Sequence, residues 1–338
     1  MDRLKDGDMD GLIRFRRTAI VVVTLLAALA LWATPASAVT PPKVMAALGD
    51  SITRGYNSAG TEFTPGTCPM LRGTPPNPLD LDCPTNSWST GTNPAVNSQF
   101  QRIEAIDPGR NPVAFNDSVS GARAGTDRSN DLVNQVRTAV SQDPDYVTIE
   151  IGANDACRSS IAAQTPTGTF RDHVEAALNT LVGADPKVYI EMLSIPDINK
   201  LWELFTSPPN PDALLRWSAF ATCQALLANP LSTLEADVDR REAFRAQVIA
   251  YNGALADVCA EFKRCRFDNN AVFKSSITVA DVATVRNTAG LPGADFWDNV
   301  PVIDPSGYAG STADYFHPSL LGQASLAESS WNATFPMN

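Results

Sequence analysis

Histidine is scarce in this chain, because only His173 and His317 occur among its 338 residues. Imidazole is the commonest metal ligand in proteins, so this scarcity argues against a histidine-rich metal centre. It also leaves two candidates for a histidine that acts as a general base. His173 lies in a stretch of helical spacing with polar neighbours, which predicts a solvent-facing side chain. His317 lies in a proline-containing loop, where a side chain can be aimed at a site, and is the favoured base.

Two sequence motifs are also missing. No C-x-x-C occurs, which together with the few histidines makes zinc the weaker explanation of the cysteines. No G-x-S-x-G occurs either. That string forms the nucleophile turn of the α/β-hydrolases, so their fold is not supported whichever serine acts.

Basic residues are in the minority, with 26 Lys and Arg against 37 Asp and Glu and a net charge of −11. An acidic surface repels phosphate backbones and anionic lipid headgroups. We therefore expect no nucleic-acid partner and no role that depends on binding an anionic membrane.

Long apolar runs are lacking as well. The longest, Ala19–Trp32, is shorter than the roughly 20 residues that a transmembrane helix needs. Three arginines (Arg14, Arg16 and Arg17) precede it and Ala36-Ser37-Ala38 follows, which predicts a secretory signal peptide over residues 1–38. An uncleaved N-terminal anchor is the alternative, and Sec and twin-arginine export both stay open. The signal segment holds five basic and four acidic residues, a net charge of +1, so the secreted chain from Val39 would be near −12.

All six cysteines lie beyond this signal: Cys68, Cys83, Cys157, Cys223, Cys259 and Cys265. An even number of cysteines in an exported protein indicates disulfides. Six cysteines allow 15 pairings. We favour sequential pairs, because the first two cysteines bracket one loop and the last two bracket a short turn. Closing the first loop would stabilise the fold by about 3 kcal/mol in the chain-entropy model.

Apolar segments alternate with stretches of helical spacing along residues 39–338, for which we expect a single domain. The predicted strands are Val44–Leu48, Val113–Asn116, Tyr146–Ile151, Val188–Leu193 and the weaker Arg264–Phe267. The predicted helices are Val96–Ile106, Asp131–Ser141, Phe170–Val182, Leu214–Leu227, Ala236–Glu261 and Leu320–Trp331. Strands that alternate with helices predict an α/β fold with a parallel sheet covered on both faces.

Three short strings each follow one of the first three predicted strands. They are GDSIT with Ser51, SGARAG with Gly121, and GAND with Asn154 and Asp155. Ligands of open α/β sheets bind outside the carboxyl ends of the strands, so the three strings should meet at one edge. A fourth string, DYFHPS with Asp314 and His317, lies near the C-terminus.

These residues supply what acyl transfer requires. Ser51 would be the nucleophile and His317 its base, with Asp314 accepting a hydrogen bond from the far ring nitrogen. The backbone N–H groups of Ser51 and Gly121 and the amide of Asn154 would stabilise the oxyanion. Each has a purely structural alternative, since serine and aspartate cap helices and loops, and glycine and asparagine form turns. We assign Asp155 to structure, as a cap of the segment that follows it.

The order of these strings resembles that of the GDSL, or SGNH, hydrolase family from about Val44 to the C-terminus. The resemblance implies a three-layer α/β/α flavodoxin-like fold of about five strands. It also implies a secreted lipase, esterase or phospholipase that cleaves acyl esters, with lipid esters as substrates. Catalysis would be of the Ser-His-Asp type through an acyl-enzyme, with no metal or organic cofactor. We expect a monomer.

Substrate choice is less constrained. Ser87-Trp88-Ser89 resembles a segment of phospholipase-B-like members of the family. It lies in Asn57–Asn97, a stretch without periodicity that could line the substrate pocket or form a disulfide-pinned surface loop. Carbohydrate acetyl esterase or envelope acyltransferase activity is an alternative, as is a catalytically silent binding protein.

Overall fold

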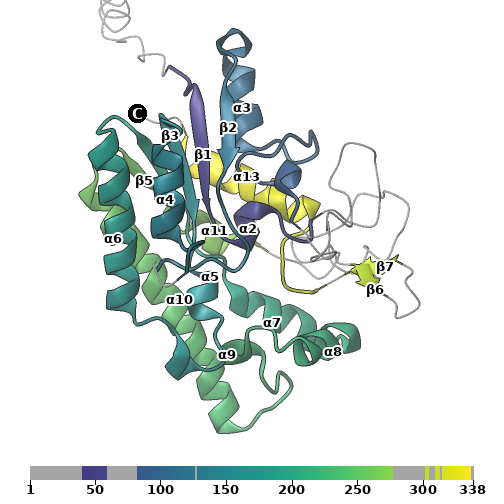
Figure 1. The fold of residues 1–338 in the computed structure, drawn as a ribbon. Helices are drawn as coiled ribbons and strands as arrows, with labels where there is room; N and C mark the ends of the chain where they lie inside the picture. The colour runs from purple at the N-terminus through teal and green to yellow at the C-terminus, as the bar shows by residue number, and fades with distance from the viewer. Residues whose placement is uncertain are drawn as a thin grey trace, which may run out of the picture. The chain divides into compact units, whose positions relative to one another are not determined.

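A central sheet of five parallel strands organises the computed structural model of this chain (Figure 1). The structure describes residues 40–58, 82–125, 128–276, 301–303, 309–312 and 314–335. The sheet order is β2-β1-β3-β4-β5, the doubly wound order of flavodoxin-like folds. Its strands are β1 (Val44–Gly49), β2 (Val113–Asn116), β3 (Tyr146–Glu150), β4 (Tyr189–Met192) and β5 (Cys265–Phe267). The predicted fold class is confirmed, and each predicted strand agrees to within one residue at either end.

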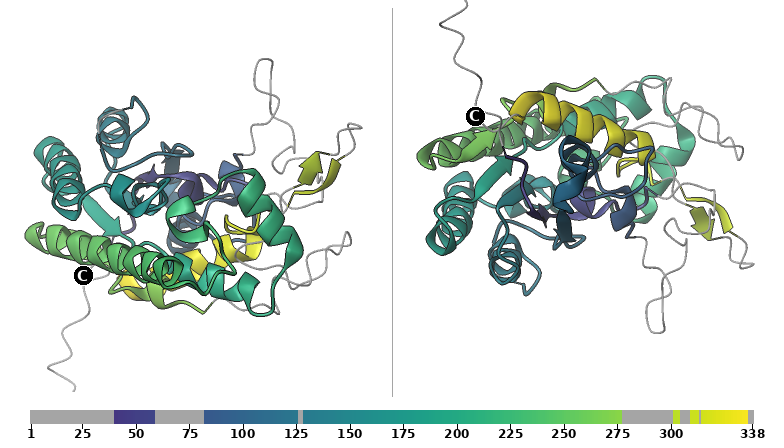
Figure 2. Two further views of the ribbon diagram at one scale, coloured as in Figure 1. Left: turned by 90° about the horizontal axis from the view of Figure 1, so that it is seen from below. Right: turned by 90° about the horizontal axis from the view of Figure 1, so that it is seen from above.

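Helices cover both faces of the sheet (Figures 1 and 2). The helices of eight or more residues are α3 (Gln99–Ile106), α4 (Leu132–Val140), α6 (Thr167–Ala184), α7 (Ile198–Thr206), α8 (Pro211–Ala219), α10 (Glu235–Glu261) and α13 (Leu320–Thr334). One-turn helices are α2 (Ser51–Arg54), α5 (Ala153–Ala156), α9 (Gln224–Leu227) and α11 (Ala271–Lys274). Two short antiparallel strands, β6 (Pro301–Ile303) and β7 (Ala309–Thr312), form a separate pair. All of these elements belong to one compact unit, Pro41–Asn338.

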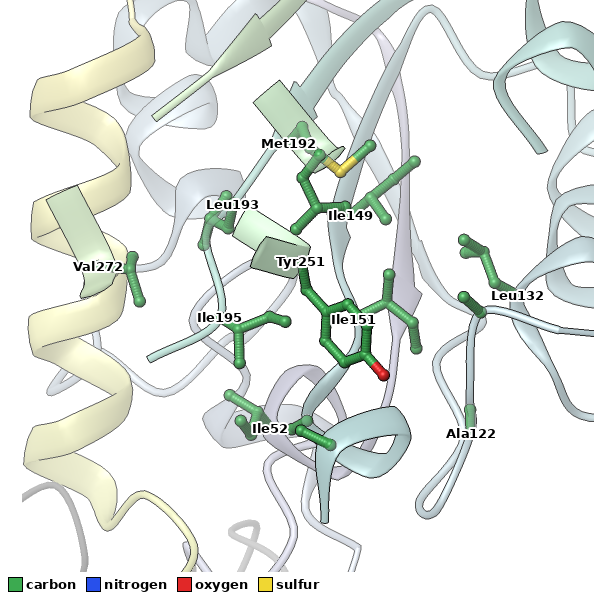
Figure 3. Close-up of a cluster of buried hydrophobic side chains, with 14 of the residues drawn as sticks. Ile52, Ala122, Leu132, Ile149, Ile151, Met192, Leu193, Ile195, Tyr251 and Val272 are labelled. Carbon is green, nitrogen blue, oxygen red and sulfur yellow. The ribbon is translucent and has the colours of Figure 1, made fainter. Parts of the chain in front are cut away.

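Successive side chains along each buried strand point to opposite faces of the sheet, so each strand contributes to the packing on both faces. Met45 and Tyr146 pack with Ile103 of α3 and with Trp331 of α13 on one face. The other face joins the larger core, in which α4 lies beside α6 and α6 beside α10. There Ile149, Met192 and Tyr251 belong to one cluster of buried side chains (Figure 3).

Local signals explain several helix boundaries. Ser98 caps α3 with a complete capping box, which shortens the predicted helix at its N-terminus. Asn210 caps α8 and Pro211 occupies its first turn. Ser319 caps α13.

The region after β4 departs from the prediction. One helix was expected over Leu214–Leu227, but α8 ends at Ala219 and α9 begins at Gln224. Between them Ala221 and Cys223 adopt positive φ angles of 48° and 41°, which a right-handed helix cannot contain. A further helix, α7, was not predicted.

The Ser87-Trp88-Ser89 string is buried in the core. The indole of Trp88 donates to Thr53 Oγ1 over 3.2 Å, and its backbone N–H donates to Gln323 over 2.8 Å. Ser89 Oγ lies 2.7 Å from Thr148 Oγ1 of β3. Residues 86–91 are therefore part of the core rather than a surface loop, whereas Thr92, Pro94, Ala95 and Asn97 are exposed. Residues 59–81 lie outside the described part.

Disulfides join Cys157 to Cys223 and Cys259 to Cys265, as the sequential pairing requires. Cys83 is also disulfide-bonded, whereas Cys68 lies outside the described residues, as does the predicted signal peptide. None of the described helices is long and apolar enough to cross a membrane.

Candidate active site

Ser51 opens α2 directly after β1, at the carboxyl edge of the sheet (Figure 1). Gly49 makes this turn possible. Its φ is +147°, and a Cβ there would lie 2.2 Å from the carbonyl oxygen of Glu150, so only glycine fits between β1 and β3. Asp50 then caps α2 by accepting the N–H of Ile52 over 2.9 Å. Gly49 and Asp50 thus hold the backbone of Ser51 in place. Ser51 is only 7% exposed, yet it lines a pocket.

His317 approaches Ser51 from the loop that precedes α13. Its Nε2 lies 3.0 Å from Ser51 Oγ, within hydrogen-bond distance. Its Nδ1 lies 2.5 Å from Asp314 Oδ2. The second carboxylate oxygen of Asp314 accepts the backbone N–H groups of Phe316 and His317 over 2.8 and 2.9 Å. The structure thus joins serine, histidine and aspartate in one hydrogen-bonded line, although 266 positions separate Ser51 from His317.

The electrostatic surroundings keep Asp314 ionised. Burial alone would raise the pKa of its carboxyl. The charge of His317 and the hydrogen bonds from His317 and Asn57 outweigh burial, so the pKa lies below its usual value. A carboxylate in this position holds the imidazole in the tautomer whose Nε2 can accept a proton from Ser51.

Asn154 lies on α5, immediately after β3, and lines the same pocket as Ser51 and His317. The other lining residues are Ile52, Ala153, Cys157, Ile198 and Phe316. Asn154 Nδ2 donates one hydrogen bond, over 3.1 Å, to the backbone carbonyl of Ala122. That bond ties the turn after β2 to the turn after β3. The Asn154 side chain also hydrogen-bonds to the Asp50 carboxyl.

Gly121 lies in the turn after β2 with φ +79°, a conformation that favours glycine. A Cβ there would meet no atom within 4 Å, so steric crowding does not explain the residue. Gly121 is not among the pocket-lining residues. The structure therefore gathers Ser51, Asn154 and His317 around one pocket, and the bond from Asn154 to Ala122 ties the turn that holds Gly121 to it.

Two expectations about neighbouring residues need correction. His173 does not face solvent freely: it is half-buried on α6, where its ring packs against Gly125. Asp155 does not cap the segment that follows it. Its buried carboxylate accepts the Ala124 N–H over 3.0 Å and the Thr165 hydroxyl over 2.7 Å, and so anchors the turn after β2.

Sequence reasoning missed the support of this hydrogen-bonded line. Asn57 donates from Nδ2 to Asp314 Oδ2 over 2.6 Å. The ring of Tyr56 lies 4.7 Å from that of His317, and the ring of Phe316 lies 5.3 Å from it. Both Tyr56 and Asn57 follow the nucleophile turn in sequence, and neither residue type at that spacing signals a contact 257 positions away.

Next to Ser51 in the structure lies a pair of buried carboxyl groups. Asp50 and Glu150 are both fully buried. Burial raises the pKa of Asp50 to about 6. Burial, the charge of Asp50 and hydrogen bonding to it raise the pKa of Glu150 well above its usual value. The raised pKa of Glu150 favours its neutral, protonated form, which can stay buried beside the Asp50 carboxyl. In the sequence, the sign of this buried pair is Glu150, a glutamate within the apolar run YVTIEIG.

Residues 45–329 match the family model described as GDSL-like Lipase/Acylhydrolase. The chain belongs to this family. The predicted family is thereby confirmed, and this GDSL hydrolase is a carboxylic ester hydrolase.

Among curated proteins, the GDSL hydrolase is similar to membrane-associated phospholipase B1. It is 25% identical over 290 residues to the Rattus norvegicus protein, covering 75% of this chain and 18% of the relative. It is 28% identical over 195 residues to the Mus musculus protein, covering 49% and 12%. The chain thus spans less than a fifth of the length of these relatives.

Solved structures are more distantly similar. Phospholipase A1 from Streptomyces albidoflavus NA297 is 16% identical, with a TM-score of 0.39 over 86% of this chain and 98% of that one. A family two carbohydrate esterase from Cellvibrio japonicus is 12% identical, with a TM-score of 0.41 over 86% of this chain and 60% of that one.

Proposed function

We propose that this GDSL hydrolase cleaves the acyl ester of a lipid through an acyl-enzyme on Ser51. The observation that carries the proposal is the line from Ser51 Oγ to His317 Nε2 (3.0 Å) and from His317 Nδ1 to Asp314 (2.5 Å). Nucleophile, base and orienting carboxylate lie within hydrogen-bond reach of one another, which is the geometry that activates a serine.

In the first half-reaction, the Ser51 hydroxyl attacks the ester carbonyl carbon while His317 Nε2 takes its proton. The carbonyl electron pair moves onto oxygen. The N–H groups of Ser51 and Gly121 and the side-chain amide of Asn154 are the proposed donors to this oxyanion. Asp314 stabilises the imidazolium that forms.

The tetrahedral intermediate then collapses. The electron pair returns to re-form the carbonyl, the bond to the alcohol oxygen breaks, and the imidazolium gives its proton to the leaving alcohol. In the second half-reaction His317 takes a proton from water, which attacks the acyl-enzyme and releases the carboxylic acid. The proton that water lost returns to Ser51, so the enzyme is restored.

Two observations support a lipid ester. The pocket wall beside Ser51 is largely apolar, with Ile198, Phe316 and Ala153, which suits an acyl chain. The curated relatives are phospholipases by name.

Replacement of the nucleophile tests the chemistry. We expect Ser51→Ala to abolish hydrolysis of p-nitrophenyl esters and labelling by a fluorophosphonate, with an unchanged thermal unfolding curve. Undiminished hydrolysis by a folded Ser51→Ala protein contradicts the proposal. A series of acyl lengths, with acetylated xylan as one member, then tests the substrate class. Preference for the acetylated polysaccharide contradicts the lipid ester and favours a carbohydrate esterase.

Export is part of the proposal. Residues 1–38 would be removed as a signal peptide, and residues 39–338 would form the single secreted domain. The disulfides support an oxidising compartment. N-terminal sequencing of protein recovered from the culture medium should start near Val39. Six free thiols in unfolded, non-reduced protein contradict the proposal.

A further inference from the structure

One carboxylate connects the helix of the nucleophile to the turn that holds Gly121. Asp82 Oδ2 accepts a hydrogen bond from Arg54 Nε over 3.2 Å, and Asp82 Oδ1 accepts one from Ser120 Oγ over 2.5 Å. Arg54 ends α2, the helix that begins with Ser51, and Ser120 directly precedes Gly121. The two oxygens of Asp82 thus link α2 to the turn after β2.

The Arg54 side of this link is fixed by further contacts. Its guanidinium also donates from Nη1 to the backbone carbonyl of Asn116, the last residue of β2, over 2.9 Å. Asn116 Nδ2 donates in return to the backbone carbonyl of Thr53 on α2 over 3.2 Å. The side chains of Arg54 and Asp82 are 29% and 19% exposed, so their ion pair is largely withdrawn from water. Asp82 is therefore held in one place and presents a fixed acceptor to Ser120.

Hydrogen bonds, rather than close packing at Gly121, hold the turn after β2. A Cβ on Gly121 would meet no atom within 4 Å. The Val119 N–H donates to the carbonyl of the last residue of β1 over 3.1 Å, and the Arg128 guanidinium donates to the carbonyl of Gly121. The Gly121 N–H belongs to the preceding peptide group, whose carbonyl comes from Ser120. The Ser120 side chain is thus the anchor next to the N–H of Gly121.

We propose that Asp82 positions the Gly121 N–H for the oxyanion by holding Ser120 against α2. The inference rests on the proposed function, in which Gly121 is one of the oxyanion donors. Such donors stabilise a transition state only when they already point to the developing charge, and loss of one costs on the order of 10²–10³ in turnover in a well-studied protease. Asp82 is not among the described residues that line the pocket. It is therefore a positioning residue, which acts through Ser120.

Three variants separate the two arms of this link. Asp82→Ala removes both hydrogen bonds, Ser120→Ala removes the one next to Gly121 and leaves the ion pair with Arg54, and the third variant combines both replacements. We expect kcat and kcat/KM for p-nitrophenyl acetate to fall together by about tenfold in each, because a misdirected donor weakens only the stabilisation of the transition state. The combined variant should lose no more than Asp82→Ala, since the two side chains act as one unit. Asp82→Asn keeps an acceptor for Ser120 and should lose less.

Two further readouts separate positioning from a merely structural role. Phenylboronic acid adds to Ser51 Oγ, whose proton passes to His317, and forms a tetrahedral anion that mimics the intermediate. Its inhibition constant should therefore rise about tenfold, in step with the loss of kcat/KM. The acid limb of the kcat/KM profile should stay at the same pH, because the contacts of His317 with Ser51 and Asp314 are kept. The matched control is Asp237→Ala, which breaks another largely buried pair of carboxylate and arginine, with Arg240 on α10. The control should keep kcat, KM and the inhibition constant.

The outcomes distinguish the role of Asp82 from the esterase chemistry itself. Unchanged kcat in Ser120→Ala or in folded Asp82→Ala overturns the inference, as does a rise of KM alone. A combined variant whose loss equals the product of the two single losses overturns it, and so does an equal loss in Asp237→Ala. If Asp82→Ala does not fold, Ser120→Ala decides, because it deletes a single oxygen atom. Ser51→Ala tests the nucleophile separately: if it is inactive while the Asp82 and Ser120 variants are unimpaired, only the positioning role fails.

Discussion

Asn57 Nδ2 donates a hydrogen bond of 2.6 Å to Asp314 Oδ2, the same oxygen that faces His317. The two residues are 257 positions apart. Asn57 has a positive φ of 61°, a conformation that asparagine tolerates well. The bond connects the turn after Ser51 to the loop of His317, and we propose that Asn57 positions the Ser51, His317 and Asp314 line.

Loss of this bond should slow the chemical step. Asn57→Gly keeps the positive φ without strain and removes the hydrogen-bond donor. We expect kcat to fall about tenfold with little change in KM, because hydrogen bonds to charged groups contribute about 1.5–3 kcal/mol. Asn57→Asp places a second carboxylate beside Asp314 and His317, which favours the protonated imidazole. The acid limb of the kcat/KM profile should therefore move to higher pH. If the role of Asn57 were purely structural, its replacement would lower stability and leave the acid limb of the kcat/KM profile at the same pH.

The buried pair of Asp50 and Glu150 should make stability fall as pH rises. Below the ordinary pKa of glutamate, folded and unfolded chains both keep the Glu150 proton. Above it the unfolded chain releases that proton while the folded chain retains it, because burial and Asp50 raise the pKa of Glu150. Stability is therefore lost as pH rises toward the folded pKa.

Glu150→Gln removes this titration and keeps the shape of the side chain. We expect it to be more stable than wild type at pH 8 by about 1 kcal/mol or more, with the gain shrinking at about pH 5. Denaturant unfolding at several pH values measures the difference. Glu104→Gln on the exposed side of α3 is the control and should show no such trend. A pH-independent loss of stability in Glu150→Gln contradicts the raised pKa of Glu150.

The two described disulfides should differ in their effects. Cys157–Cys223 closes a separation of 66 residues and Cys259–Cys265 one of 6. In the chain-entropy model, replacing the first pair by serine costs about 4 kcal/mol and the second about 2 kcal/mol. Cys157 also lines the pocket, so the first replacement should raise KM as well. Thermal unfolding and ester kinetics of both double variants check this, and an equal rise of KM in both contradicts it.

Much of the fold could be predicted because β1, β3 and β4 are short, largely apolar runs that are buried almost throughout. Boundaries of α3 and α13 follow from serine caps that are local in sequence. The break between α8 and α9 could not be predicted, because it depends on backbone angles at Ala221 and Cys223 that no local pattern signals. The burial of Trp88 was missed for a similar reason: its partners, Thr53 and Gln323, lie 35 and 235 positions away.

The sequence alone was enough to identify which side chains could act as nucleophile and base. Two histidines, one strand-to-helix serine and an Asp-x-x-His string leave few ways to build a base and its nucleophile, and strand order alone brings three of the strings to one edge. Tertiary structure decided how these groups are held. The bond from Asn57 to Asp314 joins residues 257 positions apart, and the bond from Trp217 to Tyr315 joins residues 98 positions apart. Such contacts arise from the packing of whole elements, and no local periodicity encodes them.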